Sequence, residues 1–510
     1  MGCCGSKGDA NAHPDIVPIA ANGSPALSKE WLQAAMKRGG SLPAGASVTR
    51  LETDAMVVMS LEGNEREDGG GISGPKIVKL RVGYSGEGVA VLPATVVVKW
   101  GSLAHFVPFE LPIRVYLWYV GLSFEKMLRC EAAVYSNAKT LEDAGLRIPK
   151  ILYNGVTFPK GSDGQPDDAN SCLFVCCGRR TAVRAVQVME DCSVDYEPCP
   201  VAHHTPIDRS TAILATMAKV HAWGWGKTTA PFEGAWDLSP HVAAGIGRTK
   251  RQYGAKANFS DGKAVAEYIT LWKDVATMNL DTSRSSTYKD HPEFLTMLTQ
   301  IAEGATIWEP KAAALSPLEG AKPVGSTILH GDMHQWNHLF RKGEGADPND
   351  LILIDWQFTG CGHAAWEVQY MFGASQDFIS VDTDMGLLRG YYDQLMVQLQ
   401  KQGKMEQLVG GKTAAQYTFD QFYEEWLIVH LDGMAQSIIT MSKFIKPPAF
   451  EKLLEDEKDR ELMLISMCVR NRVLARLYGH LIANPDQNMK NKLLGGDSET
   501  AEETPLINQL

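Results

Sequence analysis

Three polar residues in the segment Thr327–Tyr370 are of the types that phosphoryl transfer requires. Asp332 and Asn337 lie in the sequence HGDMHQWN, and Asp355 directly follows the apolar run Leu351–Ile354. In kinase catalytic loops, an Asp at this spacing from an Asn accepts the substrate hydroxyl proton, and the Asn holds a metal ion. A carboxylate at the mouth of a buried strand is well placed to hold Mg²⁺ on nucleotide phosphates. This spacing therefore predicts phosphoryl transfer.

The same segment admits two simpler interpretations. His330, His334 and His338 recur at intervals of four, as zinc ligands on one face of a helix do. A glycine and an aspartate interrupt the first turn of such a helix, however, and strand-like apolar runs flank it. Alternatively, Asp332 and Asn337 are only turn residues. Neither interpretation accounts for the further elements upstream, which occur in kinase order.

Upstream, a glycine-rich loop is predicted to contact phosphates. The sequence GGGISG contains Gly69, Gly71 and Gly74, between strands predicted at Ala55–Leu61 and Ile77–Tyr84. Without Cβ atoms, such a loop lets backbone N–H groups approach phosphates closely. A loop between two strands is typical of kinases, whereas a Rossmann loop leads into a helix. An ordinary hairpin loop is the alternative.

A lysine and a glutamate are predicted to form the next part of a nucleotide site. Lys99 lies near the end of a strand predicted at Ala94–Trp100, where it either pairs with phosphates or protects an edge strand. A helix predicted at Phe124–Lys139 carries Glu125 and Glu131. We favour Glu131 as the partner of Lys99, because a glutamate in the first turn is explained by the helix dipole. A solvated helix face would explain either one.

A hinge is predicted at Val188–Cys192, where the backbone, including that of Val188 and Glu190, would meet adenine. It follows a hairpin predicted from Ser171–Cys177 and Thr181–Met189. Beyond the hinge the apolar period becomes helical. The predicted helices, together with the opening one, are Lys29–Arg38, Pro206–Ala222, Met385–Gln402, Thr418–Phe444 and Ala449–Ile482.

Composition restricts the class of protein. The 510 residues are 45% hydrophobic and 21% charged, as in a globular protein, and the net charge of −11 argues against a nucleic-acid partner. The ten cysteines form no CxxC pair, so we expect reduced thiols in the cytoplasm. The most apolar long stretch, 106–124, is interrupted by prolines and charges, so no membrane-spanning helix is predicted.

The N-terminal sequence MGCCGSK matches a lipidation pattern. Gly2 and Ser6 fit N-myristoylation, and Cys3 and Cys4 are positioned for palmitate. Two acyl chains give a stable anchor where one does not. We therefore expect membrane association through these lipids. The alternative is a flexible tail that happens to begin Met-Gly.

Several of these motifs resemble one family. HGDMHQWNHLF and LILIDWQ resemble the aminoglycoside phosphotransferase and choline-kinase-like superfamily, specifically its ecdysteroid-kinase-like (CHK kinase-like) branch. Four further segments of the chain resemble the same branch, and these are EWLQAAMKRGG, GGGISGPKIVKLRVGY, LPATVVVKW and VQVMEDCS. The resemblance implies an α+β, protein-kinase-like two-lobe fold, with an antiparallel-sheet N-lobe and a mainly helical C-lobe. The predicted parts are an N-terminal tail (1–27), the N-lobe (28–190), the C-lobe (191–485) and a disordered acidic tail (486–510).

The resemblance also implies roles in catalysis and metal binding. Asp332 would be the catalytic base, with His330 ordering the catalytic loop and His334 lining it. Asn337 and Asp355 would be the Mg²⁺ ligands, and ATP would be the phosphate donor.

For the nucleotide, the resemblance implies that Lys99 pairs with the α- and β-phosphates and that Glu131 holds Lys99. Val188 and Glu190 would belong to the adenine-binding hinge. The chain departs from the family at Glu367, where members often carry an Asp that braces the catalytic loop. The departure puts the support of the loop in doubt, and not its metal ligands.

Together these features predict an ATP- and Mg²⁺-dependent kinase that phosphorylates an alcohol group of a small molecule. The expected partners are ATP, a small hydroxylated substrate and a membrane surface, with no nucleic acid or protein. The alternative is a membrane-tethered pseudokinase that binds without turnover, although it would have no need of an intact Asp332, Asn337, Asp355 and Lys99. A protein kinase is disfavoured, because the loop reads HGD and the DFG and APE motifs are missing. The helices expected to face the substrate carry no recognisable signature for the acceptor.

Overall fold

The computed structural model describes residues 27–56, 76–102, 124–157, 184–199, 205–232, 234–239, 297–298, 300–301, 303–315, 323–444, 472–483 and 487–495. The chain divides into two compact units. Unit 1 comprises Met1–Val201, Phe232–Trp236 and Trp336–Thr359, and unit 2 comprises Ala202–Pro231, Asp237–Gln335 and Gly360–Leu510. The segment Trp336–Thr359, which carries Asn337 and Asp355, is grouped with the N-terminal part of the chain. The predicted division into lobes at residue 190 stays a prediction.

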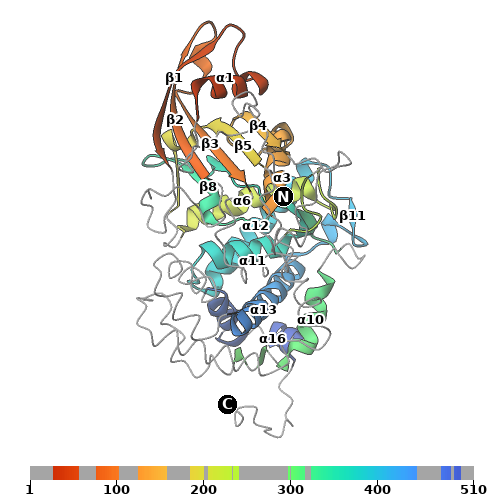
Figure 1. Cartoon of the computed structure of the whole chain (residues 1–510). Coiled ribbons are helices and arrows are strands. Elements are labelled where there is room, and N and C mark those ends of the chain that lie inside the picture. The colour runs from red at the N-terminus through yellow and green to blue at the C-terminus, as the bar shows by residue number, and fades with distance from the viewer. Residues whose placement is uncertain are drawn as a thin grey trace, which may run out of the picture. The chain divides into compact units, whose positions relative to one another are not determined.

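Unit 1 contains a five-stranded antiparallel sheet (Figure 1). Its strand order is β1-β2-β3-β5-β4. The strands are β1 (Ser47–Met56), β2 (Lys76–Ser85), β3 (Thr95–Ser102), β5 (Arg184–Glu190) and β4 (Ile151–Thr157). The predicted strands at 77–84 and 94–100 are thus present, and the one predicted at 55–61 begins earlier, at Ser47.

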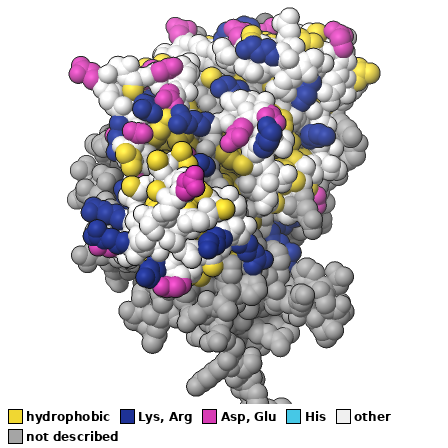
Figure 2. Space-filling model, turned by 90° about the horizontal axis from the view of Figure 1, so that it is seen from above, with side chains coloured by type: hydrophobic (Ala, Val, Ile, Leu, Met, Phe, Trp, Pro, Cys, Tyr) yellow, Lys and Arg dark blue, Asp and Glu magenta, His cyan; other side chains and the backbone are white. Residues whose placement is uncertain are grey.

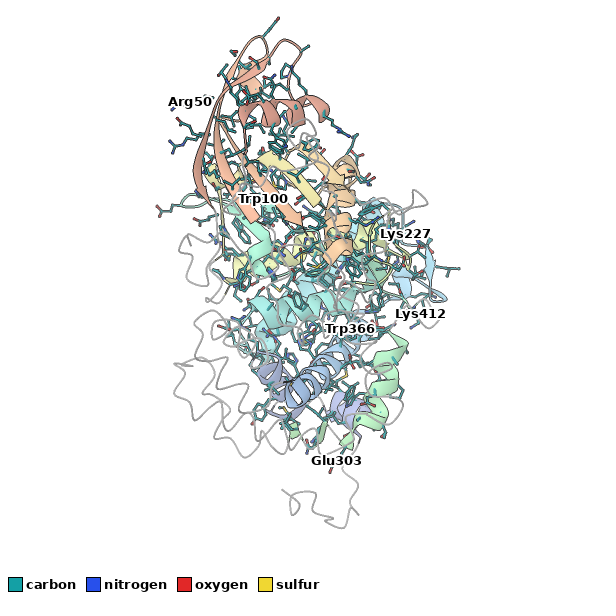
Figure 3. The ribbon with its side chains drawn as sticks, viewed as in Figure 1. Arg50, Trp100, Lys227, Glu303, Trp366 and Lys412 are labelled. Carbon is teal, nitrogen blue, oxygen red and sulfur yellow. The ribbon has the colours of Figure 1, made fainter. Side chains whose placement is uncertain are left out.

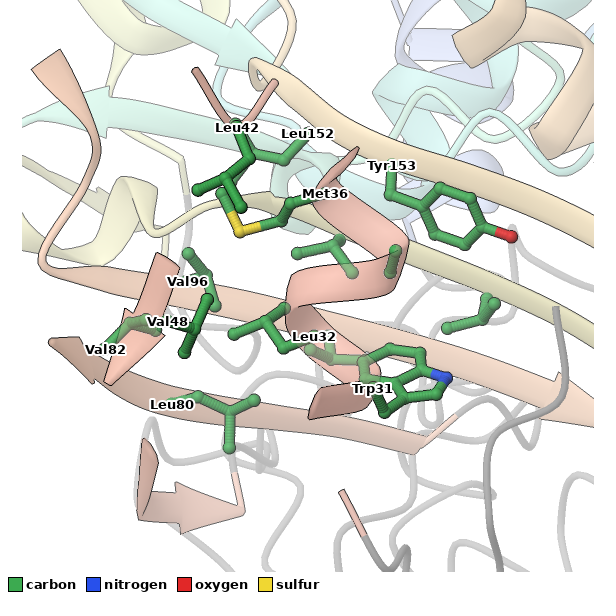
Figure 4. Packing of buried hydrophobic residues seen from close by; sticks show 14 of the residues in the cluster. Trp31, Leu32, Met36, Leu42, Val48, Leu80, Val82, Val96, Leu152 and Tyr153 are labelled. Carbon is green, nitrogen blue, oxygen red and sulfur yellow. The ribbon is translucent and has the colours of Figure 1, made fainter. Parts of the chain in front are cut away.

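One face of this sheet packs against α1 (Lys29–Arg38), whose predicted bounds are confirmed. The Ser28 side chain caps the helix by accepting the backbone N–H of Trp31, which is the N-cap interaction that serine favours. Figure 4 shows Trp31, Leu32 and Met36 of α1 packed against apolar side chains of the strands. Val96, Val98 and Trp100 of β3 belong to this buried cluster. Because strand side chains alternate, Lys99 faces the opposite side of the sheet.

The central position of β5 corrects one prediction. Val188 pairs with Val98 of β3 on one side and with Tyr153 of β4 on the other. With both edges of the strand occupied, the predicted hairpin between 181–189 and 171–177 is wrong for the described part of β5. Residues 171–177 lie outside the described residues.

A second, three-stranded sheet in unit 1 has the order β6-β8-β9. Its strands are β6 (Tyr196–Pro198), β8 (His338–Arg341) and β9 (Leu351–Leu353). The helix predicted at 124–139 is interrupted at Asn137, which separates α3 (Phe124–Ser136) from α4 (Ala138–Asp143).

Unit 2 is mainly helical. Its helices include α6 (Ile207–Gly224), α10 (Ala305–Ala314), α11 (Ala364–Ser375), α12 (Val381–Lys401), α13 (Phe419–Phe444) and α16 (Gln487–Leu494), with a π-helical turn at Gly479–Ala483. Two strand pairs accompany them, β7 (Ser326–Leu329) with β10 (Gly360–His363) and β11 (Leu408–Val409) with β12 (Lys412–Thr413). The predicted α+β class, with an antiparallel-sheet part and a mainly helical part, is confirmed.

The C-terminal tail is partly ordered. The prediction of disorder from residue 486 onward is wrong for α16, in which Leu493 is fully buried. The α-carbon of Leu494 approaches Gly304, at the start of α10, so closely that a Cβ there would lie 2.8 Å from it. This apolar contact outweighs the polar composition of the tail.

Charged side chains of both signs lie on the described surface. Figure 2 shows Lys and Arg side chains interspersed with Asp and Glu on the face in view. Figure 3 shows the side chain of Arg50 extending away from β1, whereas Trp100 lies in the buried cluster. Within the described parts of the chain, no helix is both long enough and apolar enough to span a membrane.

Candidate active site

The ammonium group of Lys99 is shared by two carboxylates in unit 1. Its Nζ lies 2.7 Å from Oε1 of Glu131 on α3 and 2.7 Å from Oδ1 of Asp355, which follows β9. Glu131 is only 2% exposed. The structure therefore brings together a strand lysine, a mid-helix glutamate and a loop aspartate that are far apart in the sequence, and it selects Glu131 as the partner of Lys99.

Lys99, Glu131 and Asp355, which we call the triad, combine one ammonium group with two carboxyl groups. Burial alone would lower the pKa of Lys99, but Asp355 and Glu131 outweigh it and hold the pKa above its ordinary value. Burial raises the pKa of Glu131 to about 7, and the charge of Lys99 opposes that rise. One ammonium cannot neutralise two ionised carboxylates. With both carboxylates ionised the triad carries an excess negative charge, which attracts a cation.

Asn337 and Asp355 are brought to the same end of the β8–β9 ladder. His338 pairs with Leu353, and the N–H of Ile354 donates to the carbonyl of Asn337 at 3.0 Å. Asp355 then turns away with φ +64°, and it is the one non-glycine residue with positive φ in the described part of the chain. Such strained backbone conformations occur often at functional sites, where the surroundings enforce them.

The residue types that the β8–β9 ladder brings to one end, an asparagine and an aspartate, suit magnesium. A carboxylate and an amide oxygen are hard oxygen ligands, and Mg²⁺ is commonly held by one or two such groups together with phosphates. The described residues contain no group of three or more His, Cys, Asp or Glu side chains placed to hold a metal. His330, His334 and His338 form no such group among the described residues.

In unit 2, the carboxylate of Asp332 is contacted through both of its oxygens. The Tyr370 hydroxyl donates to Oδ1 at 2.8 Å, and Nε2 of His334 lies 3.5 Å from Oδ2. Burial and the charge of Asp332 raise the pKa of Tyr370 well above its ordinary value, so the phenol stays protonated as a donor. Sequence reasoning missed Tyr370, although it lies one helical turn after Glu367 and so shares its face of α11.

Glu367 braces the loop that carries Asp332. Its Oε1 accepts the N–H of Gly331 at 2.6 Å, and its Oε2 accepts the N–H of His330 at 3.3 Å. Nε2 of His221 lies 2.9 Å from the same Oε2, and Nδ1 of His221 lies 2.6 Å from the Tyr391 hydroxyl. The glutamate therefore reaches the loop despite its departure from the family residue. His221 holds the glutamate.

The segment after β5 is anchored to β2. Lys79 Nζ lies 2.7 Å from Oδ2 of Asp191, whose other oxygen accepts the N–H and hydroxyl of Ser193 at 3.0 and 2.6 Å. Although burial acts to raise it, these hydrogen bonds hold the pKa of Asp191 below its ordinary value. Of the predicted hinge residues, Val188 is a buried sheet residue and Glu190 ends β5. The chain leaves β5 at Asp191.

The phosphate-loop glycines Gly69, Gly71 and Gly74, and the lipidation residues Gly2, Cys3 and Cys4, lie outside the described residues.

A comparison with protein families supports the resemblance seen in the sequence. The model of the ecdysteroid kinase-like family matches residues 313–404. This segment contains Asp332, Asn337, Asp355 and Glu367. The family model thus matches the segment on which the predicted resemblance mainly rested. Among curated proteins, none matches this chain.

Several solved structures resemble the chain at low identity. A microcompartment-associated aminopropanol kinase is 12% identical, with a TM-score of 0.35, and the match covers 88% of this chain and 97% of that one. The choline kinase LicA from Streptococcus pneumoniae is 12% identical, with a TM-score of 0.31 and coverage of 84% and 94%. An aminoglycoside-3'-phosphotransferase of type VIII is 14% identical, with a TM-score of 0.28 and coverage of 72% and 96%. At these TM-scores the likenesses identify neither a reaction nor a substrate.

Proposed function

We propose that this chain is an ATP- and Mg²⁺-dependent kinase that transfers a phosphoryl group to an alcohol of a small molecule. The observation that carries the proposal is the triad in unit 1, in which Lys99 contacts Glu131 and Asp355 at 2.7 Å each. A lysine paired with a helical glutamate and an aspartate after a strand are the parts that kinases use on nucleotide phosphates. The ecdysteroid kinase-like match to residues 313–404 supports the same reaction class.

In this mechanism, Lys99 donates to the α- and β-phosphates of ATP, and Glu131 keeps its side chain extended toward them. Asp355 and Asn337 would hold Mg²⁺. When bound, the metal neutralises charge on the β- and γ-phosphate oxygens. Because Lys99 already contacts Asp355, nucleotide binding exchanges one of its carboxylate contacts for phosphate oxygens. The lysine stays charged throughout, as the pKa held above its ordinary value requires.

Asp332 is proposed to accept the proton of the acceptor hydroxyl as that oxygen attacks the γ-phosphorus. The bond from the γ-phosphorus to the β–γ bridging oxygen breaks, ADP leaves, and the phosphate ester forms. Tyr370 donates to one carboxylate oxygen and so fixes the rotation of the carboxylate, while His334 lies beside the other. Glu367 holds the backbone on the N-terminal side of Asp332 through Gly331. Positioning of this kind supplies most of the rate acceleration in phosphoryl transfer.

Separate variants test the two halves of the mechanism. Asp332→Asn should abolish ATP-dependent turnover over a panel of hydroxylated metabolites and leave nucleotide binding largely intact. Asp355→Asn should weaken binding of Mg-ATP as well as turnover, because the metal loses its carboxylate. Full turnover by Asp332→Asn would show that another group is the base. ATP binding without any product would favour the pseudokinase alternative.

We further propose that the N-terminal sequence anchors the enzyme to a membrane through acyl groups on Gly2, Cys3 and Cys4. The sequence pattern supports this proposal, because it offers sites for more than one acyl chain. A single acyl chain binds membranes only marginally, whereas two bind stably. Intact-mass and peptide mass spectrometry of protein made in eukaryotic cells tests this directly. Gly2→Ala should abolish both the myristoyl group and membrane co-sedimentation. Unmodified Gly2 in the wild-type protein would refute the anchor.

A further inference from the structure

A short segment leaves unit 2 and joins unit 1. Phe232–Trp236 belongs to unit 1, whereas the chain on either side of it, through Pro231 and from Asp237, belongs to unit 2. We call Phe232–Trp236 the strap (Glu233 lies outside the described residues). The strap makes contacts with the two parts of unit 1 that carry the carboxylates of the Lys99 triad.

The strap first holds the turn that follows Asp355. The backbone N–H of Trp236 donates to the carbonyl of Thr359 at 3.0 Å, and its indole N–H donates to the carbonyl of Gln357 at 3.0 Å. Trp236 is 7% exposed. Gln357 in turn donates to Oδ2 of Asp355 at 3.3 Å. One side chain thus fixes the backbone two residues beyond the proposed metal ligand.

The strap also lies against α3, which carries Glu131. At Gly234 a Cβ would lie 3.1 Å from the carbonyl oxygen of Arg129 and 3.2 Å from Cβ of Ala133, and the φ of +89° favours glycine. Nζ of Lys126 lies 4.9 Å from the centroid of the Trp236 ring, within range of a cation–π interaction. A side chain at this position would therefore crowd α3 and adopt a strained φ.

A buried thiol joins the same two parts directly. Sγ of Cys130 on α3 lies 3.4 Å from the carbonyl oxygen of Trp356 and 3.3 Å from that of Thr359. Burial raises the pKa of Cys130 to about 12, so the thiol is protonated and can donate. Helix, turn and strap therefore form one packed group of three segments.

We infer that the strap, with Trp236 as a positioning residue, holds α3 and the turn after Asp355 as one piece, so that Glu131 and Asp355 stay on Lys99. In protein kinases, the position of the helix that carries the glutamate controls activity. Here the chain itself fixes that helix, so assembly of the triad needs no separate activating event. The effect of the strap on catalysis rests on the proposed function, whereas its effect on the positions of α3 and the turn does not.

Trp236→Phe tests the inference, because it removes the indole N–H and keeps an aromatic ring in place. By hydrogen–deuterium exchange, amides of α3 and of the turn should exchange about tenfold faster in the variant. Turnover should need a higher Mg²⁺ concentration for half-saturation, by about fivefold to tenfold. The matched control is Trp308→Phe in unit 2, which removes a comparable bond from a buried indole to the carbonyl of Ile301 at 2.9 Å.

The control separates positioning from general destabilisation. Trp308→Phe should lower the unfolding midpoint and leave both the exchange of α3 and the Mg²⁺ requirement unchanged. Gly234→Ala is a second variant, and it should reproduce the exchange effect because its Cβ crowds α3. If Trp236→Phe changes neither readout more than the control does, the inference is wrong and the kinase proposal is unaffected. If the wild type has no turnover, the exchange measurement still decides the role of the strap.

Discussion

Replacing Glu367 with glutamine removes a buried negative charge while keeping the side-chain shape. The carboxylate is 3% exposed and faces three donors, the N–H groups of Gly331 and His330 at 2.6 and 3.3 Å and Nε2 of His221 at 2.9 Å. Bonds to a charged acceptor contribute about 1.5–3 kcal/mol each, and neutral ones about 1 kcal/mol. The amide keeps one acceptor oxygen and presents an NH₂ group to a donor. Glu367→Gln should therefore lower the free energy of unfolding by about 3 kcal/mol.

The loop that carries Asp332 should loosen at the same time. Because misplacement of a catalytic group by about 1 Å can cost a factor of about 100 in rate, kcat should fall by roughly that factor while the KM for ATP changes little. Urea unfolding followed by fluorescence gives the stability, and steady-state kinetics give kcat. The control is Glu424→Gln, which weakens more exposed ion pairs with Lys311 and Lys492 and should cost at most about 1 kcal/mol. If Glu367→Gln lowers the free energy of unfolding no more than Glu424→Gln does, Glu367 does not brace the loop.

Three further predictions follow from the same geometry. Lys99→Met leaves two carboxylates without their counter-charge. Turnover should therefore be lost, and the free energy of unfolding at pH 7, measured in urea, should fall by about 3 kcal/mol. Unchanged stability would mean that the triad is not formed. Tyr370→Phe should lower kcat about tenfold without changing the KM for ATP, because it removes the hydroxyl that donates to Asp332. The control Tyr423→Phe removes a hydroxyl bonded to Nδ1 of His480 at 2.7 Å and should leave kcat unchanged. Equal effects of the two variants on kcat would exclude a special role for Tyr370. Burial holds the pKa of His430 well below its ordinary value, so below about pH 6.5 the unfolded chain binds a proton that the folded chain does not. The free energy of unfolding should then fall by up to about 1.4 kcal/mol per pH unit on acidification, and His430→Phe should remove that part of the slope between pH 5 and 7; parallel pH profiles would show that His430 is not buried as a neutral group.

Local patterns in the sequence were sufficient to predict several parts of the molecule. The cap at Ser28 and the apolar spacing after it predicted α1, because both signals lie within one helix. Alternation predicted the strand that carries Lys99. The position of Glu131 in the middle of a helix, away from the dipole at its start, was enough to select it over Glu125.

Contacts between distant segments were not predictable in the same way. Nothing local to Trp236 indicates that it donates to Gln357, which is more than a hundred residues away in the chain. The segment 336–359 joins unit 1 through the pairing of β8 with β6. The periodicity of the sequence does not indicate which strands pair. The polar composition around α16 predicted disorder, but burial of Leu493 decides the outcome.

The central claim is that the chain transfers the γ-phosphoryl group of ATP to an alcohol. It is tested most directly by incubating the full chain with γ-³²P-labelled ATP, Mg²⁺ and pools of hydroxylated metabolites, and by detecting labelled phosphate esters after separation. We predict at least one acceptor-dependent labelled product, which disappears with Asp332→Asn and when Mg²⁺ is chelated. Labelled product that persists with Asp332→Asn, or ATP binding with no labelled ester from any acceptor, would contradict the claim.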